Sequence, residues 1–421
     1  MARSIFSRLA GVTQLTTATG LSQVAALAAA PLITRLYSPG QLGDFAVYGA
    51  ILAILMVVAC LRFELAIVLP EDRQTAIALG LLASLCSVFV SSLVFVVVWL
   101  GADLFAARLN LQGGGSVLLF VPVALCMAGL LRAATYWFIR QQDYRHLAYS
   151  KLSQSLPQTA AQVAFGFMAL GPLGLILGDL VGRFSGNVSL WWKLRVQQAD
   201  AWKRLPRAEL RRAASRYRRF PTISIWSGLI NEIGTMAPTL LLAGLFGAST
   251  AGFYGLVQRM LALPMDLVGQ SVAAVFLGEA STAYRLHPDQ LKRLFLRYAG
   301  GLFLVGILPA AAMAAMGEFI FEWIFGNQWG EAGKYAEVLS FAFLLRFSLA
   351  PLAQILNVIE RHDILLSWDL ARTATLIAAV VIPGMTGAAA LTAVMWYAIA
   401  LGALQIVFFP IVLSQLTKSR S

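Results

Sequence analysis

Arginine residues stand inside stretches of sequence that are otherwise apolar, and their side chains could bind an anion. A charged residue at the centre of a membrane helix costs roughly 2.5 to 3.5 kcal/mol on insertion scales, so each one needs a partner or a function. The planar guanidinium group binds phosphate through paired donors. Arginines lining one cavity would therefore suit an anionic cargo such as a pyrophosphate. These arginines are Arg62, Arg132, Arg183, Arg259, Arg346 and Arg372.

Some of these arginines have neighbours that could neutralise them. Asp179 precedes Arg183 by four residues and Asp369 precedes Arg372 by three, which are the spacings of ion pairs within a helix. Intrahelical neutralisation and contact with cargo both stay open for these pairs. Arg62 falls near the end of a predicted span, so its side chain could either line a cavity or snorkel to the membrane surface.

Other arginines lack such a neighbour and are the stronger cavity candidates. Arg132 has no acidic residue within one helical turn, and Arg346 shares a predicted helix face with Asn357, eleven residues further on. Arg259 shares a face with Asp266, two turns away, which leaves open a salt bridge to another helix. We expect Arg132 and Arg346 to face the cavity.

Polar residues inside the spans could bind sugars or ions. Gln154 and Gln158 share one face of the predicted span 147–170, where they could contact sugar hydroxyls or hold helices together. Glu232, Asp266 and Asp369 are candidate sites for a coupling proton or sodium ion. Each carboxylate could equally neutralise an arginine. No other cofactor is expected.

The composition places these side chains in a membrane protein. Hydrophobic residues make up 59% of the 421, and charged residues only 12%. Apolar stretches of about 20 residues, enough to cross a bilayer, recur along the chain. We predict an all-α polytopic membrane protein with spans at 10–34, 45–69, 76–100, 116–139, 147–170, 172–192, 222–246, 251–277, 294–317, 334–358, 364–382 and 388–413.

Basic residues predict the orientation and a division of the chain. Lysine and arginine concentrate in alternate connectors, which places both termini in the cytoplasm. The connector 193–221 is the most basic, and we expect it to separate an N-terminal six-helix bundle (1–192) from a C-terminal one (222–421). It would set the topology and contact anionic membrane lipids, since nothing else in the sequence indicates nucleic acid.

A weak internal repeat supports two similar halves. Ala30-Pro31 to Phe45 parallels Ala237-Pro238 to Phe253, and an even number of spans in each half would make the two copies parallel. The natural place for a substrate is then a cleft between the halves.

Cysteine and histidine give no sign of metal or disulfide chemistry. Cys60, Cys86 and Cys126 stand singly in apolar stretches, without the short spacings of a metal site. The outer connectors are short, about fifteen residues at most, and do not offer a catalytic loop. We therefore do not expect an enzyme.

Several segments resemble the Wzx-type O-antigen flippases, which belong to the polysaccharide transporter family of the multidrug/oligosaccharidyl-lipid/polysaccharide superfamily. The likeness runs along almost the whole chain. The segments that carry it are PLITRLYSPGQLGDFAVYG (31–49), LRFELAIVLPED (61–72), AGFYGLVQRMLALP (251–264) and FGNQWGEAGKYAEVL (325–339).

The resemblance implies two six-helix bundles of the MATE-like type and alternating access in the bacterial inner membrane. The cargo would be an undecaprenyl-pyrophosphate-linked oligosaccharide for O-antigen or other polysaccharide biosynthesis, with a glycan polymerase and chain-length regulator proteins as possible partners. The cationic cavity of the family is carried over to Arg132, Arg183, Arg259 and Arg346 as a hypothesis.

Two other functions stay open. An ion-coupled multidrug exporter would share the fold, but organic cations suit acidic, aromatic cavities, whereas the intramembrane balance here is slightly positive. A static scaffold for polysaccharide assembly would not need charged residues facing a cleft.

Overall fold

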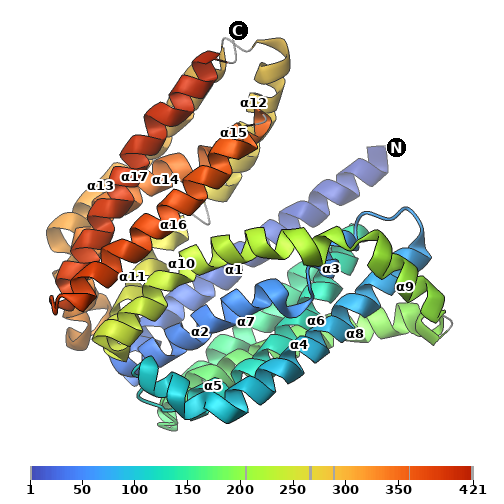
Figure 1. Ribbon diagram of the computed structural model, residues 1–421, viewed down its shortest axis with the longest axis horizontal. Helices are drawn as coiled ribbons and strands as arrows, with labels where there is room; N and C mark the ends of the chain where they lie inside the picture. Colours follow the sequence, from blue (N-terminus) through green and yellow to red (C-terminus); the bar gives the residue numbers. More distant parts are fainter. Residues whose placement is uncertain (1, 204–205, 265–267, 288–289, 360, 419–421) are drawn as a thin grey trace. The chain divides into compact units, whose positions relative to one another are not determined.

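The computed structural model is mainly helical in the residues that it describes, which are 2–203, 206–264, 268–287, 290–359 and 361–418 (Figure 1). Clustering of contacts divides the chain into two compact units, unit 1 (Met1–Met236) and unit 2 (Ala237–Ser421). Unit 1 contains α1 (Ala2–Leu36), α2 (Pro39–Ala59), α3 (Phe63–Ala66), α4 (Arg73–Arg108), α5 (Ser116–Leu119), α6 (Val121–Arg140), α7 (Tyr144–Phe167), α8 (Pro172–Lys203), α9 (Arg207–Arg216), a π-helix (Phe220–Ser224) and the first half of α10 (Ile225–Phe246).

Unit 2 begins inside α10 and contains the remaining helices. The basic segment 193–221 therefore lies within unit 1, as the end of α8 and as α9. The division into two six-helix bundles at that segment stays a prediction. The helices of unit 2 are α11 (Ala248–Pro264), α12 (Gln270–Leu286), α13 (Leu291–Phe325), a 3-10 helix (Asn327–Trp329), α14 (Gly330–Leu349), a second 3-10 helix (Ala350–Leu352), α15 (Ile355–Val358), α16 (His362–Met385) and α17 (Ala390–Lys418).

Nine helical segments of the described chain are long and apolar enough to cross a membrane. They match nine of the twelve predicted spans, and the other three predicted spans correspond to α7, α8 and the pair α11 and α12. α7 is interrupted by serine and glutamine, and α8 carries charges and glycines. α11 and α12 have 17 residues each. The prediction of an all-α polytopic membrane protein is confirmed, and twelve spans stay compatible with the structure.

The second predicted span is broken in the structure. The prediction ran from 45 to 69, whereas α2 ends at Ala59 and the short α3 starts at Phe63. Leu61 and Arg62 connect them in the left-handed backbone region, with φ of 49° and 62°. Residues with a Cβ rarely adopt this conformation. The break places Arg62 in the connection itself and Glu64 on the short α3.

The start of α4 is fixed by Asp72. Its side-chain Oδ2 accepts a hydrogen bond from the backbone N–H of Thr75 at 2.7 Å, which satisfies one of the free donors of the first turn. Hydrogen bonding by Thr75 also holds the pKa of Asp72 below its ordinary value. The charged carboxylate is therefore the form that stabilises the helix.

We expect Asp72→Ala to lower the free energy of unfolding at pH 7 by about 1 kcal/mol. A lowered pKa means that this contribution is present above the unfolded pKa and is lost as pH falls through the folded one. SDS titration of the detergent-solubilised protein measures it. Asp72→Asn is the control, because its amide oxygen caps the helix without titrating. A wild-type unfolding midpoint for Asp72→Ala at pH 7 would contradict the prediction.

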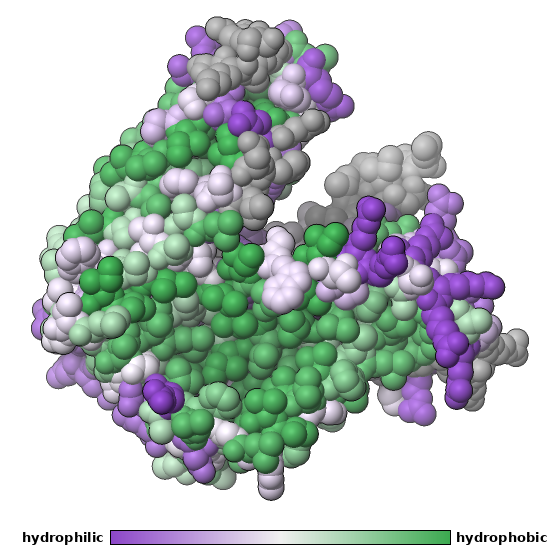
Figure 2. All heavy atoms as spheres, viewed as in Figure 1, coloured by the Kyte–Doolittle hydropathy of each residue, from purple (hydrophilic) through white to green (hydrophobic). Residues whose placement is uncertain are grey.

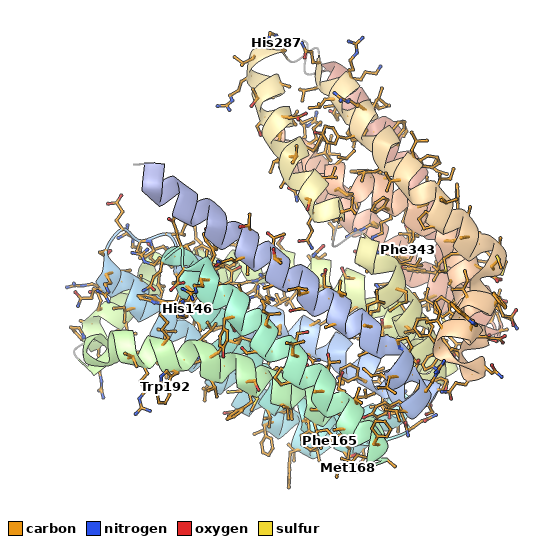
Figure 3. The ribbon with its side chains drawn as sticks, turned by 180° about the vertical axis from the view of Figure 1, so that it is seen from behind. His146, Phe165, Met168, Trp192, His287 and Phe343 are labelled. Carbon is orange, nitrogen blue, oxygen red and sulfur yellow. The ribbon has the colours of Figure 1, made fainter. Side chains whose placement is uncertain are left out.

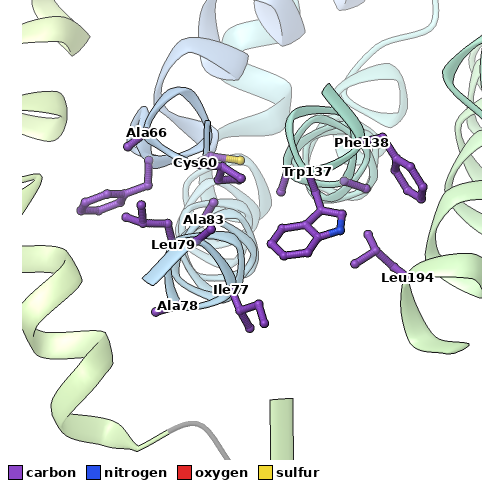
Figure 4. Packing of buried hydrophobic residues seen from close by; sticks show 14 of the residues in the cluster. Cys60, Ala66, Ile77, Ala78, Leu79, Ala83, Trp137, Phe138 and Leu194 are labelled. Carbon is purple, nitrogen blue, oxygen red and sulfur yellow. The ribbon is translucent and has the colours of Figure 1, made fainter. Parts of the chain in front are cut away.

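A buried cluster joins α3, α4, α6, α8 and α9 in unit 1. Figure 4 shows the Trp137 ring of α6 between Ile77 of α4 and Leu194 of α8. Ala213 of α9 is 1% exposed in the same cluster, and Thr75 donates its hydroxyl to Glu209 of α9 at 3.0 Å. The apolar face of α9 is therefore buried on the protein, and its arginines remain outside.

The core of unit 2 joins α12, α13, α14, α15 and α17. Aromatic rings make much of it. Trp368 of α16 lies 5.0 Å from Phe408 of α17, and Phe276 of α12 lies 5.3 Å from Tyr298 of α13, measured between ring centroids. Rings of this size bury a large apolar area and pack at these separations in edge-to-face or tilted arrangements.

The surface of unit 1 is apolar where a bilayer would cover it. Exposed hydrophobic residues follow α4, among them Phe89, Trp99 and Leu100, which is 80% exposed. On the face of unit 1 seen in Figure 2, hydrophobic residues cover the middle of the helices and hydrophilic residues gather at their ends. Such a band fits the hydrocarbon layer.

Candidate functional site

Several charged residues of unit 1 meet at the break between α2 and α3. Glu64 of α3 is 0% exposed, and one of its carboxylate oxygens lies 3.3 Å from Nε of Arg132 on α6. The Arg132 side chain is 27% exposed. The partner that the sequence around Arg132 lacks therefore comes from another element. An ion pair this deep is costly to separate, because removing one charge leaves the other buried and uncompensated.

Arg62 reaches the start of α10. Its guanidinium occupies the space beside Gly228 that a Cβ at that position would need. Glu232 follows on α10 one turn later, and its carboxylate lies close enough to Arg62 and Arg132 to interact electrostatically with both. We call Arg62, Glu64, Arg132 and Glu232 the charged quartet. Its formal charges cancel, and its members come from the α2–α3 break, α3, α6 and α10.

Arg183 is held by a second network in unit 1. Its Nε lies 2.6 Å from Oδ2 of Asp179, which confirms that the spacing of four residues brings the two charges together. Tyr48 of α2 donates its hydroxyl to the same carboxylate at 2.9 Å, and Gln158 of α7 donates its amide at 3.3 Å. The carboxylate is therefore almost fully satisfied. Arg183 keeps 19% of its side chain exposed.

The polar face of α7 lies against α8. The backbone of α8 carries glycine at every fourth position, so the two helices approach closely. A Cβ at Gly182 would lie 2.6 Å from the backbone oxygen of Gln154 and 2.6 Å from Cβ of Gln158. The amides of Gln158 and Gln162 bond to α8. The glycine ridge consists of Gly174, Gly178, Gly182 and Gly186.

The structure thus places Gln154 and Gln158 at a helix interface. Small residues at such spacing let membrane helices pack backbone to backbone, and amide side chains add hydrogen bonds across them. These contacts support a role of the polar face of α7 in helix packing. A contact with sugars stays a prediction for both residues.

Arg346 and Arg259 lie in unit 2 on different helices. The Arg346 guanidinium carbon lies 5.7 Å from the ring centre of Phe343, and its charge interacts with Tyr254 of α11. The Tyr254 hydroxyl bonds to that of Tyr397 at 3.3 Å. Arg259 is exposed on α11. Neither arginine forms part of the charged quartet.

Arg346 and Asn357 do not share one continuous helix face. α14 ends at Leu349 and a short 3-10 helix follows it. Asn357 lies in the separate α15, where its amide donates to Gln354 at 2.6 Å. The expectation of a shared face was wrong, because the helix breaks around Pro351.

The remaining acidic candidates differ in what surrounds them. Asp369 of α16 lies 3.4 Å from Arg372, as the spacing of three residues predicted. Asp266 lies outside the described residues. No group of three or more metal-ligating side chains comes together in the part of the chain that the structure describes.

An apolar cavity lies close to Arg346. It has a volume of about 190 Å³ and is lined by α11, α13 and α14. Phe343 belongs to both, since it lines this cavity and its ring lies beside the Arg346 guanidinium. Figure 3 labels Phe343 within unit 2. A charged group and an apolar recess therefore stand side by side in unit 2.

Sequence reasoning missed several residues that build these sites. Gly228 and Tyr48 have no local signal, because their partners lie far along the chain. The glycine ridge did have a local signal, since four glycines at a spacing of four can be read directly from the sequence.

A family model described as "Polysaccharide biosynthesis protein" matches residues 32–334. Among curated proteins, the chain is 28% identical over 169 residues to the lipopolysaccharide biosynthesis protein WzxC of Escherichia coli K12. It is 24% identical over 151 residues to the teichuronic acid biosynthesis protein TuaB of Bacillus subtilis 168. These matches cover 39% and 36% of this chain, but only 33% and 31% of the two relatives.

Solved structures share the fold. An inward-facing multidrug resistance transporter of the MATE family, in the MOP superfamily, superimposes with a TM-score of 0.74 over 96% of each chain, at 11% identity. The lipid II flippase MurJ, in an inward closed conformation, has a TM-score of 0.71 over 94% of this chain and 86% of its own, at 12% identity. At these identities the likeness concerns the fold alone. With the family model covering well over half of it, this multi-pass membrane chain of MATE-like fold belongs to the polysaccharide biosynthesis protein family.

Proposed function

We propose that the protein is a flippase that moves a lipid-linked oligosaccharide across the membrane. It is a transporter and not an enzyme. The finer proposal is an undecaprenyl-pyrophosphate-linked repeat unit, of O-antigen or another polysaccharide, carried from the cytoplasmic to the periplasmic leaflet of the bacterial inner membrane by alternating access. Both termini would lie in the cytoplasm.

The observation that carries this proposal is the charged quartet in a member of a polysaccharide biosynthesis family. Buried charges inside a membrane protein are expensive and mark pathways for charged cargo. The quartet holds two arginines whose donors suit phosphate oxygens. Because its own charges cancel, an entering pyrophosphate would have to displace a carboxylate from an arginine or meet a protonated Glu232.

The relatives support the same cargo class. WzxC and TuaB are named for lipopolysaccharide and teichuronic acid biosynthesis. The fold is compatible with a lipid-linked cargo, since MurJ, which shares it, is titled a lipid II flippase. In unit 2, the apolar cavity would suit a lipid chain, and Arg346 beside it would suit a phosphate. We propose that Arg346 and Arg259 complete the cationic lining, with Glu232, Asp266 and Asp369 as candidate sites for a coupling proton or sodium ion.

We expect the wild-type gene to restore surface glycan to a flippase-deficient, glycan-producing strain, and Arg346→Ala to restore roughly tenfold less or lower. The loss follows because a charge-assisted hydrogen bond contributes about 1.5 to 3 kcal/mol, or about tenfold and more in binding. Glycan is measured by gel and lectin blot at matched membrane expression.

Arg108→Ala is the matched control, since Arg108 is exposed at the end of α4. Equal rescue by Arg346→Ala and Arg108→Ala would remove Arg346 from the transport path. A wild type that rescues no glycan background but lowers drug accumulation would replace the flippase by a multidrug exporter, the activity printed for the MATE neighbour.

A further inference from the structure

A polar groove lies between α12 and α13 of unit 2, apart from the residues proposed for transport. Its volume is about 470 Å³. Figure 3 labels His287, a lining residue directly after α12, and Figure 2 shows hydrophilic side chains gathered at this end of unit 2. Its polar lining consists of Glu279, Thr282, His287, Gln290, Arg293 and Arg297.

The two helices are clamped below the groove by aromatic side chains. Phe276 of α12 is 0% exposed, and its ring lies 6.5 Å from Phe295 and 5.3 Å from Tyr298 of α13, between centroids. Leu291 and Ala280 are also fully buried. This packing fixes the separation of the helices, so the groove is a built feature of the fold.

The groove presents donors on both walls. Arg293 and Arg297 are four residues apart on α13 and therefore lie on one face of it. Thr282 of α12 and Gln290 face the same space. The one carboxylate of the lining belongs to Glu279, and the Tyr298 hydroxyl lies near it. Two guanidinium groups thus outweigh a single carboxylate.

The surroundings of the groove are those of a lipid headgroup. Leu286 at the end of α12 is 67% exposed, and Leu296 of α13 is 41% exposed, so apolar surface borders the charged lining. The positive-inside pattern of the sequence predicts that this end of unit 2 lies at the cytoplasmic leaflet. Arginine pairs next to exposed leucine match a phosphate whose acyl or prenyl chain continues into the bilayer.

We propose that this groove binds the phosphate or pyrophosphate headgroup of a lipid in the cytoplasmic leaflet. Two lipids offer that chemistry, a resident anionic phospholipid and a prenyl pyrophosphate. The site is distinct from the charged quartet, which belongs to unit 1. It does not depend on transport, so purified protein can test it whether or not the flippase proposal holds.

The test measures the thermal unfolding midpoint of the full-length protein in neutral detergent, titrated with phosphatidylglycerol or with undecaprenyl pyrophosphate. A ligand that binds only the folded state raises the midpoint. We expect a saturable rise for the wild type, with an apparent affinity at least about tenfold weaker in Arg293→Gln/Arg297→Gln. A rise with phosphatidylglycerol indicates a resident phospholipid, and a rise with undecaprenyl pyrophosphate alone indicates cargo lipid.

Two further variants keep the test decisive. A Cβ at Gly278 would meet no atom within 4 Å, so Gly278→Leu should fold while its side chain fills the groove, and it should weaken binding without removing a charge. Arg35→Gln/Arg108→Gln removes the same charge elsewhere, at two exposed positions at the ends of α1 and α4. Equal weakening by this control, an undiminished response in both groove variants, or no rise with either lipid would overturn the proposal.

Discussion

Arg132→Ala should lower the free energy of unfolding of the protein by about 3 kcal/mol, because it leaves the Glu64 carboxylate buried without its partner. Glu64 is 0% exposed, and Arg132 is the one ion-pair partner at 3.3 Å that the described residues give it. SDS titration of the solubilised protein measures the change. Arg372→Ala, which breaks a half-exposed pair within one helix, should cost far less.

A double variant separates stability from transport. In Glu64→Gln/Arg132→Gln both charges are gone, so no buried charge remains uncompensated, and we expect most of the lost stability to return. If the quartet contacts cargo, this stable variant still fails to restore surface glycan. Full restoration of glycan by the double variant would make the Glu64–Arg132 pair purely structural and would remove the central argument for the flippase site.

Gly182→Ala on α8 should destabilise unit 1 by about 1 to 3 kcal/mol, the usual cost of overpacking a close contact. The added Cβ would stand 2.6 Å from the backbone oxygen of Gln154, an atom that cannot turn aside, so α7 and α8 would have to separate. Gly178→Ala should behave alike, because its Cβ would lie 2.9 Å from the backbone nitrogen of Gln162. The SDS unfolding midpoint reports the change.

Gly80→Ala is the matched control. Gly80 lies in a long helix, α4, but a Cβ there meets no atom within 4 Å. Alanine is the better helix former, so this variant should be as stable as the wild type or slightly more so. If Gly182→Ala and Gly80→Ala unfold at the same SDS fraction, α7 and α8 are not held by the glycine ridge.

Much of the fold could be predicted because its signals are local. The apolar stretches of about 20 residues gave the helices, and the spacings Asp179 to Arg183 and Asp369 to Arg372 gave ion pairs that the structure contains. Both kinds of signal depend only on residues within one helix. The class of protein and the intrahelical pairs follow directly from such patterns.

The remaining features depend on contacts between distant segments. Arg132 meets Glu64 from another element, 68 residues earlier in the numbering, and the space for Arg62 is left by Gly228. The break after Ala59 contains neither glycine nor proline, so no local signal in the sequence predicts it. The break before Asn357 does have a local signal, which is Pro351. Which arginines contact the cargo is still a prediction, because the contacts depend on the bound cargo and on the conformation that the transporter adopts around it.

The glycine ridge also limits how the gene for this protein can change. A lipid-facing residue of α8 can be exchanged for another apolar one, because only the glycine face of α8 approaches the backbone of α7. An insertion or deletion of a single residue between Gly174 and Gly186 is different, since it turns everything beyond it by about 100° around the helix axis. The downstream glycines would then leave the face toward α7, and bulkier side chains would take their place there. We expect the lengths of connectors to drift among descendants of this gene, while the spacing inside this thirteen-residue stretch of α8 is kept.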